Sequence, residues 1–233
     1  MEHPVPSRPE LGVHDGLAYA LFMPEGEPTA GVVVLHGAGS AKESHFDFAR
    51  RATAIGMAAI AFDARGHGRS EGALGAGAVD DVLAVCELMR ARAPRIALRG
   101  SSMGGFYAVM AAAAAGDVGA VVAICPAPAD LLLRGLRSGR LTEFRTDRES
   151  LDPWLEQADI TEAVASLAPD TALMLLHAQG DEQVPYALSQ ELYHAAGEPK
   201  RLLLMPGGHH RSIQHDAELQ GESLRFVERA LAS

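Results

Sequence analysis

The amino-acid sequence predicts an α/β fold, with a mostly parallel central sheet and helices on both of its faces. Three observations lead to this class. Short runs rich in β-branched residues alternate with stretches of helical periodicity. Most of these runs are apolar at nearly every position, as in strands that are covered on both faces. The 233 residues also suit a single domain with one substantial core.

The predicted strands begin with a hairpin whose second strand spans 17–22, after the turn-prone pair Asp15-Gly16. The run 31–36 (Gly-Val-Val-Val-Leu-His) ends at Gly37 and has the continuous apolar character of a buried central strand. Similar runs predict further strands at 57–63, 95–100, 118–124, 171–177 and 200–205. Because helices separate these strands, right-handed crossovers are expected to make them parallel.

Helices are predicted between the strands. Apolar residues recur at spacings of three and four from 79 to 89, and the alanine-rich stretch 106–115 is a second helix. A third, at 186–196, is opened by Pro185 and closed by Gly197. The C-terminal tail carries apolar residues on one helical face, at Leu224, Val227 and Leu231.

One long segment, 126–169, follows a strand and precedes the next without a strand of its own. Its apolar patches have helical spacing, which predicts a helical insertion packed over the top edge of the sheet. We therefore expect a single domain, 1–233, with a short lid at about 126–169 rather than a second domain.

Composition limits the classes of partner. The formal net charge is −10, so nucleic acid and anionic lipid are repelled at long range and neither nucleic acid nor a membrane is expected as a partner. No run of eighteen apolar residues predicts a membrane span. Residues 1–6 lack the basic start and apolar core of a secretory signal. The cysteines, Cys86 and Cys125, are expected as buried thiols rather than a disulfide or metal pair, which favours a cytoplasmic location.

The strongest chemical signal is a serine between two glycines. Ser102 stands at the centre of the run 100–104 (Gly-Ser-Ser-Met-Gly), with a predicted strand before it and a predicted helix after it. Glycines two residues before and after allow a sharp turn that raises the hydroxyl at the carboxyl edge of the sheet. Chance could produce such a run in a glycine-rich loop, but the strand and helix argue against chance. Ser101 lacks the symmetric glycines and is expected to have a packing role.

A family resemblance is carried by the runs 32–37 (Val-Val-Val-Leu-His-Gly), 62–70 (Phe-Asp-Ala-Arg-Gly-His-Gly-Arg-Ser) and 100–105. With these runs the chain resembles the α/β-hydrolase superfamily from about Leu17 to Ala230, least closely in the 126–169 segment. The likeness is strongest toward small bacterial esterases, serine aminopeptidase-like hydrolases and dienelactone-hydrolase-like enzymes. It implies the α/β-hydrolase fold and catalytic residues in the order Ser, acid, His.

The resemblance places the acid on the loop after the strand 171–177. The run 178–185 (Ala-Gln-Gly-Asp-Glu-Gln-Val-Pro) is similar to the family run of Gly, acid, two variable residues, Val and Pro. This likeness implies Asp181 as the acid. Glu182 could substitute chemically, but the spacing to the Val-Pro pair favours Asp181.

The base is expected after the last strand, where 206–210 reads Pro-Gly-Gly-His-His. Family loops usually place the histidine two or three residues beyond the glycine that follows the strand. That pattern implies His210 rather than His209. The two could in principle bind a metal, but zinc needs three or four ligands and no Cys or Glu cluster supplies the others. No metal and no cofactor are therefore expected.

The oxyanion hole needs two backbone donors. The run 36–39 (His-Gly-Ala-Gly) is similar to the family's His-Gly-x loop, which implies the N–H of Ala38, and the second donor is the N–H of Met103. The same loop does not match a dinucleotide or Walker pattern, so nucleotide binding is not predicted. Three histidines at strand ends are expected to be structural: His36, His67 and His177.

These residues predict a serine hydrolase that acts on a small-molecule acyl substrate. Ser102 attacks the acyl carbon, and carboxylic ester cleavage is the default because esters need less leaving-group assistance than amides. Serine instead of aspartate at the turn disfavours haloalkane dehalogenase and epoxide hydrolase chemistry. Dienelactone hydrolases usually have a cysteine at this position, so the serine also disfavours dienelactone hydrolysis. The alternatives are an aminopeptidase or a thioesterase on the same residues, and a ligand sensor without turnover. The oligomeric state is not predicted.

Five arginines lie in the 126–169 segment of this acidic chain: Arg134, Arg137, Arg140, Arg145 and Arg148. One interpretation is a solvated helical face whose arginines pair with Glu143, Asp147 and Glu149. The other is that one or two guanidinium groups face the site entrance and favour an anionic substrate. In the second interpretation the leucines of 131–141 line an apolar acyl pocket.

Overall fold

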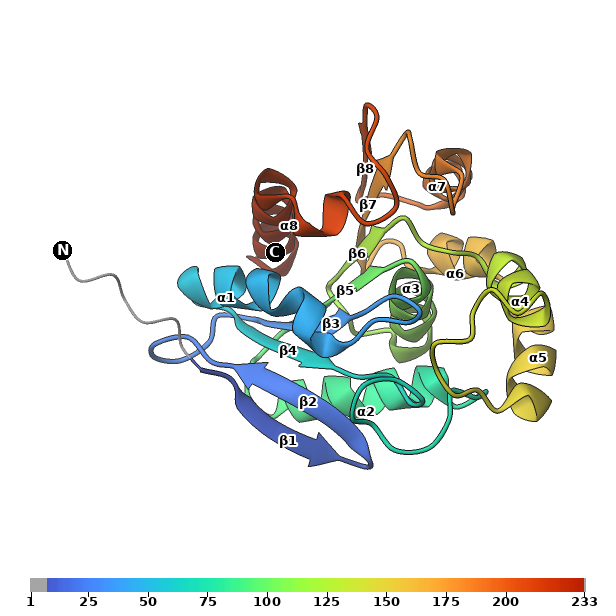
Figure 1. Ribbon diagram of the computed structural model, residues 1–233. Coiled ribbons are helices and arrows are strands. Elements are labelled where there is room, and N and C mark those ends of the chain that lie inside the picture. Colours follow the sequence, from blue (N-terminus) through green and yellow to red (C-terminus); the bar gives the residue numbers. More distant parts are fainter. Residues whose placement is uncertain (1–7, 233) are drawn as a thin grey trace.

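The apolar runs form one sheet with helices on both of its faces (Figure 1). The computed structural model describes residues 8–232, and these form an eight-stranded sheet in the order β1-β2-β4-β3-β5-β6-β7-β8. β2 pairs antiparallel with β1 and with β4, and every other neighbouring pair is parallel. The predicted class, a mostly parallel sheet between two layers of helices, is confirmed.

Every predicted strand is present, with small shifts at the ends. The bounds are β1 (Glu10–His14), β2 (Leu17–Phe22), β3 (Gly31–Leu35), β4 (Ala58–Phe62), β5 (Ile96–Ser101), β6 (Ala120–Ile124), β7 (Ala172–Ala178) and β8 (Lys200–Met205). β5 extends to Ser101, so it ends immediately before Ser102. Strands β2 to β7 are buried at every position, which is the burial that their continuous apolar sequences predict.

The helices are α1 (Phe46–Ala54), α2 (Ala78–Arg90), α3 (Met103–Ala115), α4 (Ala129–Arg137), α5 (Arg148–Gln157), α6 (Ile160–Ser166), α7 (Tyr186–Ala195) and α8 (Ala217–Ala232). Two short 3-10 turns, η1 (Lys42–His45) and η2 (Ile213–His215), stand before α1 and α8. Helix α3 begins at Met103, three residues before its predicted start, so it follows Ser102 directly. Helix α1 was not predicted, because its buried face contains only Phe48, Ala49 and Ala52.

Two apolar clusters cover the two faces of the sheet. Helices α1 and α8 pack on one face, and α2, α3, α6 and α7 lie on the other (Figure 1). Cys86, in α2, belongs to the cluster under α2, α3, α6 and α7. Cys125, directly after β6, belongs to the cluster under α1 and α8. Both are buried free thiols, as the sequence predicts.

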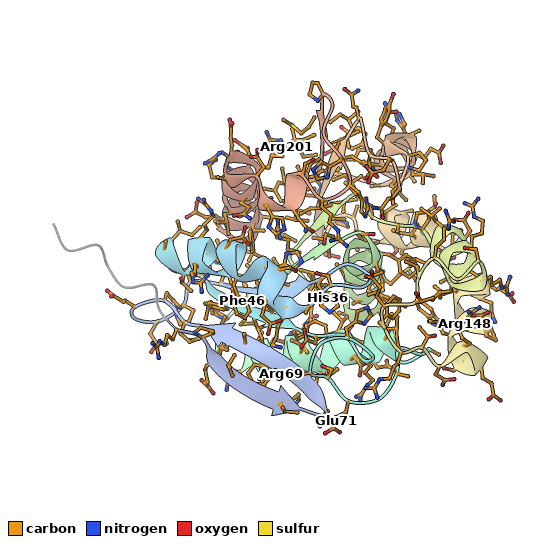
Figure 2. All side chains as sticks on the ribbon, viewed as in Figure 1. His36, Phe46, Arg69, Glu71, Arg148 and Arg201 are labelled. Carbon is orange, nitrogen blue, oxygen red and sulfur yellow. The ribbon has the colours of Figure 1, made fainter. Side chains whose placement is uncertain are left out.

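The 126–169 segment contains α4, α5 and α6 between β6 and β7. Helix α4 packs against α5, whereas α6 packs against α3 and α7 within the layer that covers the sheet. Figure 2 shows Arg148, at the start of α5, on the side of this segment that faces away from the sheet. The one β-bridge of the segment joins Thr146 to Leu74. The segment thus forms helices, as predicted, and α6 is part of the main helical layer.

Within residues 8–232, no helix has both the length and the apolar character needed to cross a membrane. Residues 1–6, whose composition predicts the absence of a secretory signal, lie outside the described residues.

Candidate active site

Ser102 occupies a sharp turn between β5 and α3. Its backbone angles are φ 54° and ψ −117°, a region that non-glycine residues rarely adopt. The turn is held by hydrogen bonds: the N–H of Ser102 donates to the carbonyl of Ile124 (2.8 Å), and its own carbonyl accepts from the N–H of Phe106 (3.1 Å). Such strain persists where the surrounding structure imposes it, and it is typical of a nucleophile elbow.

Two glycines make this turn sterically possible. A Cβ on Gly100 would overlap the carbonyl oxygen of Gly104. A Cβ on Gly104 would lie 2.5 Å from the carbonyl oxygens of Leu35 and His36, at the end of the neighbouring strand β3. The glycines therefore allow strand, turn and helix to approach more closely than any other residue permits.

Asp181 lies on the loop after β7, and its side chain is fully buried. The N–H groups of Gln183 and Val184 donate to its Oδ1 (2.8 and 2.9 Å), while Oδ2 lies 2.7 Å from Nδ1 of His210 and 3.3 Å from Nε2 of His177. Burial by itself would raise the pKa of this carboxyl. The hydrogen bonds outweigh burial and hold the pKa well below its usual range, so Asp181 is ionised.

His210 is the histidine that the structure brings to this carboxylate. Its backbone N–H also donates to Glu182 (3.2 Å), so Glu182 contacts the histidine loop without contacting the ring. His209 is exposed, and its Nδ1 accepts from the N–H of Arg211 (3.3 Å). Of the two histidines weighed from sequence, His210 is therefore the one oriented by an acid.

His177 was expected to be structural, and its contacts explain why it is buried. Nδ1 lies 2.7 Å from Oγ of Ser189, and Nε2 lies 2.8 Å from the carbonyl of Val184 in addition to its contact with Asp181. The ring therefore braces the loop that carries the acid. Sequence reasoning missed this contact with Asp181, because His177 lies in β7 and Asp181 on the loop after it, where no regular spacing brings side chains together.

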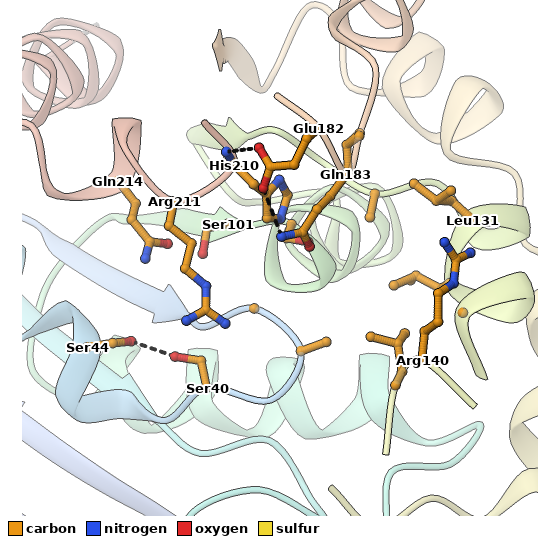
Figure 3. Close-up of a pocket in the computed structure, with 18 of the residues that line it drawn as sticks. Ser40, Ser44, Ser101, Leu131, Arg140, Glu182, Gln183, His210, Arg211 and Gln214 are labelled. Carbon is orange, nitrogen blue, oxygen red and sulfur yellow. Dashed lines mark hydrogen bonds between the residues drawn. The ribbon is translucent and has the colours of Figure 1, made fainter. Parts of the chain in front are cut away.

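Ser102 and His210 line the same cavity, which has a volume of about 390 Å³ (Figure 3). Such a volume suits a small organic ligand. The 126–169 segment supplies one wall, through Ala127, Leu131, Leu132, Gly135, Arg140 and Leu141. The opposite wall consists of the η1 region and the loop after His210, and it contains Ser40, Ser44, Arg211, Gln214 and His215.

Both backbone groups predicted for the oxyanion hole lie close to this turn. Ala38 lines the cavity, next to Gly37. Met103 is the first residue of α3, so its N–H has no acceptor within the helix. It lies at the N-terminus of the helix, which is the positive end of the helix dipole. These two N–H groups come from the loops that follow β3 and β5, which are neighbouring strands of the sheet.

Two histidines tether the Ala38 loop to the loop after β4. Nε2 of His36 accepts from the N–H of Ala64 (3.0 Å), and Nε2 of His67 accepts from the N–H of Gly39 (3.2 Å). Nδ1 of His67 donates to the carbonyl of Arg65 (3.1 Å), so the neutral ring satisfies both contacts. These placements agree with the structural role predicted for both residues.

Burial, reinforced by the nearby His36, lowers the pKa of His67 to about 4, against smaller opposing effects of the Arg65 carbonyl and of Asp63. The ring of Phe144, from the 126–169 segment, stacks on His67 with ring centroids 4.0 Å apart. His67 is therefore neutral near pH 7 and can accept the hydrogen bond from Gly39.

A buried ion pair fixes the same region. Nζ of Lys42 lies 2.6 Å from Oδ2 of Asp63, and the backbone N–H of Lys42 donates to Oδ1 (2.8 Å). The N–H of Arg69 also donates to Asp63 (2.9 Å). Asp63 thus joins η1 to the loop that carries His67.

One trio of possible metal ligands occurs within the described residues: Cys125, Asp181 and His210, whose ligand atoms lie within 4.8 Å of one another. Burial raises the pKa of the Cys125 thiol far above its usual range, which keeps it protonated and a poor ligand. Asp181 and His210 are already hydrogen-bonded to each other. The trio fits an Asp–His pair with a packed thiol better than a metal centre.

Three of the five arginines of the 126–169 segment form ion pairs at the surface: Arg134 with Asp130 (2.8 Å), Arg137 with Glu156, and Arg148 with Asp152 (2.5 Å). The solvated-face interpretation holds for these three. The acids named as partners were wrong, since Glu143, Asp147 and Glu149 pair with none of the five in the described part of the chain. Asp147 instead caps the N-terminus of α5 by accepting from the N–H of Ser150.

Comparison with known proteins finds likeness in sequence and in fold. The family model of the serine aminopeptidases (S33) matches residues 26–133. The uncharacterized protein YfhR of Escherichia coli O157:H7 is 26% identical over 221 residues, covering 89% of this chain and 73% of YfhR. The α/β hydrolase GrgF from Penicillium sp. sh18 superposes with a TM-score of 0.79 at 18% identity, over 96% of this chain and 98% of GrgF. Est1E from Butyrivibrio proteoclasticus, in a structure with ferulic acid bound, gives a TM-score of 0.75 at 22% identity, over 94% and 98% of the two chains.

Proposed function

We propose that this chain, which has the fold of the α/β hydrolases, is a serine hydrolase that cleaves carboxylic esters through an acyl-enzyme on Ser102. One observation carries the proposal. His210 is hydrogen-bonded through Nδ1 to a buried, ionised Asp181 at 2.7 Å, and it lines a cavity together with a serine held in a strained turn. The proposed substrate is a small acyl compound.

The proposed reaction follows from which nitrogen of His210 is occupied. Because Nδ1 donates to Asp181, Nε2 is unprotonated and available to take the proton of the Ser102 hydroxyl. The serine oxygen attacks the acyl carbon, and the resulting oxyanion accepts from the N–H groups of Ala38 and Met103. His210 then protonates the leaving alcohol, and the same nitrogen activates the water that releases the acid.

Asp181 has two functions in this proposal. Its hydrogen bond selects the tautomer of His210 that can act as a base, and its negative charge stabilises the imidazolium that forms during attack. The lowered pKa supports the second function, since a carboxyl that stays ionised keeps its charge at every pH where the histidine acts.

An aminopeptidase is the second candidate, because the serine aminopeptidase model matches residues 26–133. A peptide substrate would place its free amine near a carboxylate. Among the described residues that line the cavity, Glu182 is the one that supplies such a group. The ester proposal is preferred because an ester needs less assistance to its leaving group, and because the similar Est1E carries ferulic acid, a carboxylic acid, in its structure.

The test compares p-nitrophenyl esters of graded acyl length with aminoacyl p-nitroanilides. We expect the wild-type protein to cleave esters in preference to anilides. Ser102→Ala is expected to lower kcat by several orders of magnitude. The control is Ser101→Ala, which changes the adjacent serine and is expected to lower kcat far less. Wild-type turnover in Ser102→Ala would contradict the proposal, and a preference for anilides would support the aminopeptidase.

A further inference from the structure

Two guanidinium groups reach the candidate cavity from opposite walls (Figure 3). Arg140 belongs to the 126–169 segment, shortly after α4, and lies beside Leu131. Arg211 directly follows His210, and its side chain extends toward Ser40 and Ser44. The proposed reaction uses neither side chain.

Neither guanidinium has a carboxylate partner among residues 8–232. Nε of Arg140 donates to the Oγ of Ser138 (3.1 Å), and no hydrogen bond or ion pair is formed by the Arg211 side chain within the described residues. By contrast, Arg134, Arg137 and Arg148 of the same segment all have acidic partners. The two cationic groups at the cavity are thus the ones left free to bind an anion.

Within residues 8–232, the carboxylates near the cavity form their contacts with other groups and not with these two arginines. Glu182 is exposed and accepts from the N–H of His210 (3.2 Å) and from Gln183 (3.3 Å). The charge of Asp181 is engaged by its histidines, and His215 lies 3.2 Å from Asp47. A chain of net charge −10 repels anions at long range, so binding of an anion at this cavity depends on direct contact with the unpaired guanidinium groups.

We propose that the substrate is an anionic ester, in which the acyl chain ends in a carboxylate that Arg140 binds and that Arg211, on the opposite wall, attracts by its charge. This inference rests on the proposed esterase function. The leucines 131, 132 and 141 line the wall beside Arg140 and provide an apolar surface for the methylene chain. A guanidinium matches the two oxygens of a carboxylate, whereas the methyl end of a fatty acyl chain leaves it without a partner.

The test uses two p-nitrophenyl esters of equal size. The monoester of adipic acid carries a terminal carboxylate, and 6-methylheptanoate has an uncharged isopropyl group of the same shape. Their kcat/KM values are measured at low and high salt, with spontaneous hydrolysis subtracted, for the wild-type protein, Arg140→Gln, Arg211→Gln and the double variant. Arg145→Gln is the matched control, because Arg145 belongs to the same segment, is exposed and does not line the cavity.

The measured quantity is the ratio of kcat/KM for the anionic ester to that for the neutral ester. We expect this ratio to fall by about threefold in each single variant and by about tenfold in the double variant, as exposed ion pairs allow. It should stay unchanged in Arg145→Gln, and high salt should lower it in the wild-type protein. If neither the double variant nor high salt changes the ratio, the inference of an anionic substrate is wrong, whereas the proposed esterase function stands. Failure to cleave either ester overturns the proposed function and this inference with it.

Discussion

Replacing His67 with glutamine tests how the loop of Ala38 is held in place. The buried ring accepts the N–H of Gly39, and that acceptor is lost when the ring is protonated. Glutamine cannot titrate, so the variant removes one proton-binding group from the folded and the unfolded protein. His194→Gln is the control, because His194 is exposed on α7.

The magnitude follows from the shift of the His67 pKa, from 6.5 in the unfolded chain to about 4 in the folded protein. Between these values the unfolded state binds more protons, so stability rises with pH. The contribution is complete above pH 6.5 and is lost as the pH falls to 4. A difference of roughly 2.5 pKa units corresponds to about 3 kcal/mol.

The assay is urea unfolding of the wild-type protein and both variants at a series of pH values from 4 to 7. We expect the free energy of unfolding of the wild-type protein to fall by about 3 kcal/mol more than that of His67→Gln over this range. His194→Gln should follow the wild-type curve. His36 and His45 also have lowered pKa values, but they are present in every protein compared. Parallel curves for the wild-type protein and His67→Gln would refute the reasoning.

Two further predictions concern the site and its support. His210→Ala is expected to lower kcat on a p-nitrophenyl ester by several orders of magnitude, and His209→Ala far less; the reverse ranking would move the base to His209. Lys42→Met leaves the carboxylate of Asp63 buried without its cation, so urea unfolding should show a loss of about 3–5 kcal/mol. A loss below about 1 kcal/mol would show that the backbone hydrogen bonds to Asp63 suffice.

Much of the fold could be predicted from the sequence because its signals are local. A strand covered on both faces must be apolar at successive positions, and β3, β4 and β6 are visible in the chain for that reason. Helix α1 escaped prediction because only three of its residues are buried. The sequence also contains no signal that separates α6, a helix of the main layer, from α4 and α5 of the same segment.

Within the candidate site, the part that the sequence by itself determined is the turn at Ser102. The glycines at 100 and 104 are local requirements of that turn, because any Cβ there meets backbone atoms. The candidate acid and base came from resemblance in short runs, and the choice between adjacent residues remained open for both. Only the tertiary structure shows that Asp181 and His210, 29 residues apart, meet at 2.7 Å.

The same distinction between local sequence and contacts of distant segments applies to the five arginines of the 126–169 segment. Their spacing along the chain shows that five cations gather in one segment, but a charge has no preferred neighbour until side chains from other elements approach it. The structure pairs three of them with acids and leaves Arg140 at the cavity. It also brings Arg211 to the opposite wall, from a loop 71 positions further along the chain. Local residue pattern determines strands, helices and the serine turn, whereas contacts between distant loops exist only once the sheet brings their ends together.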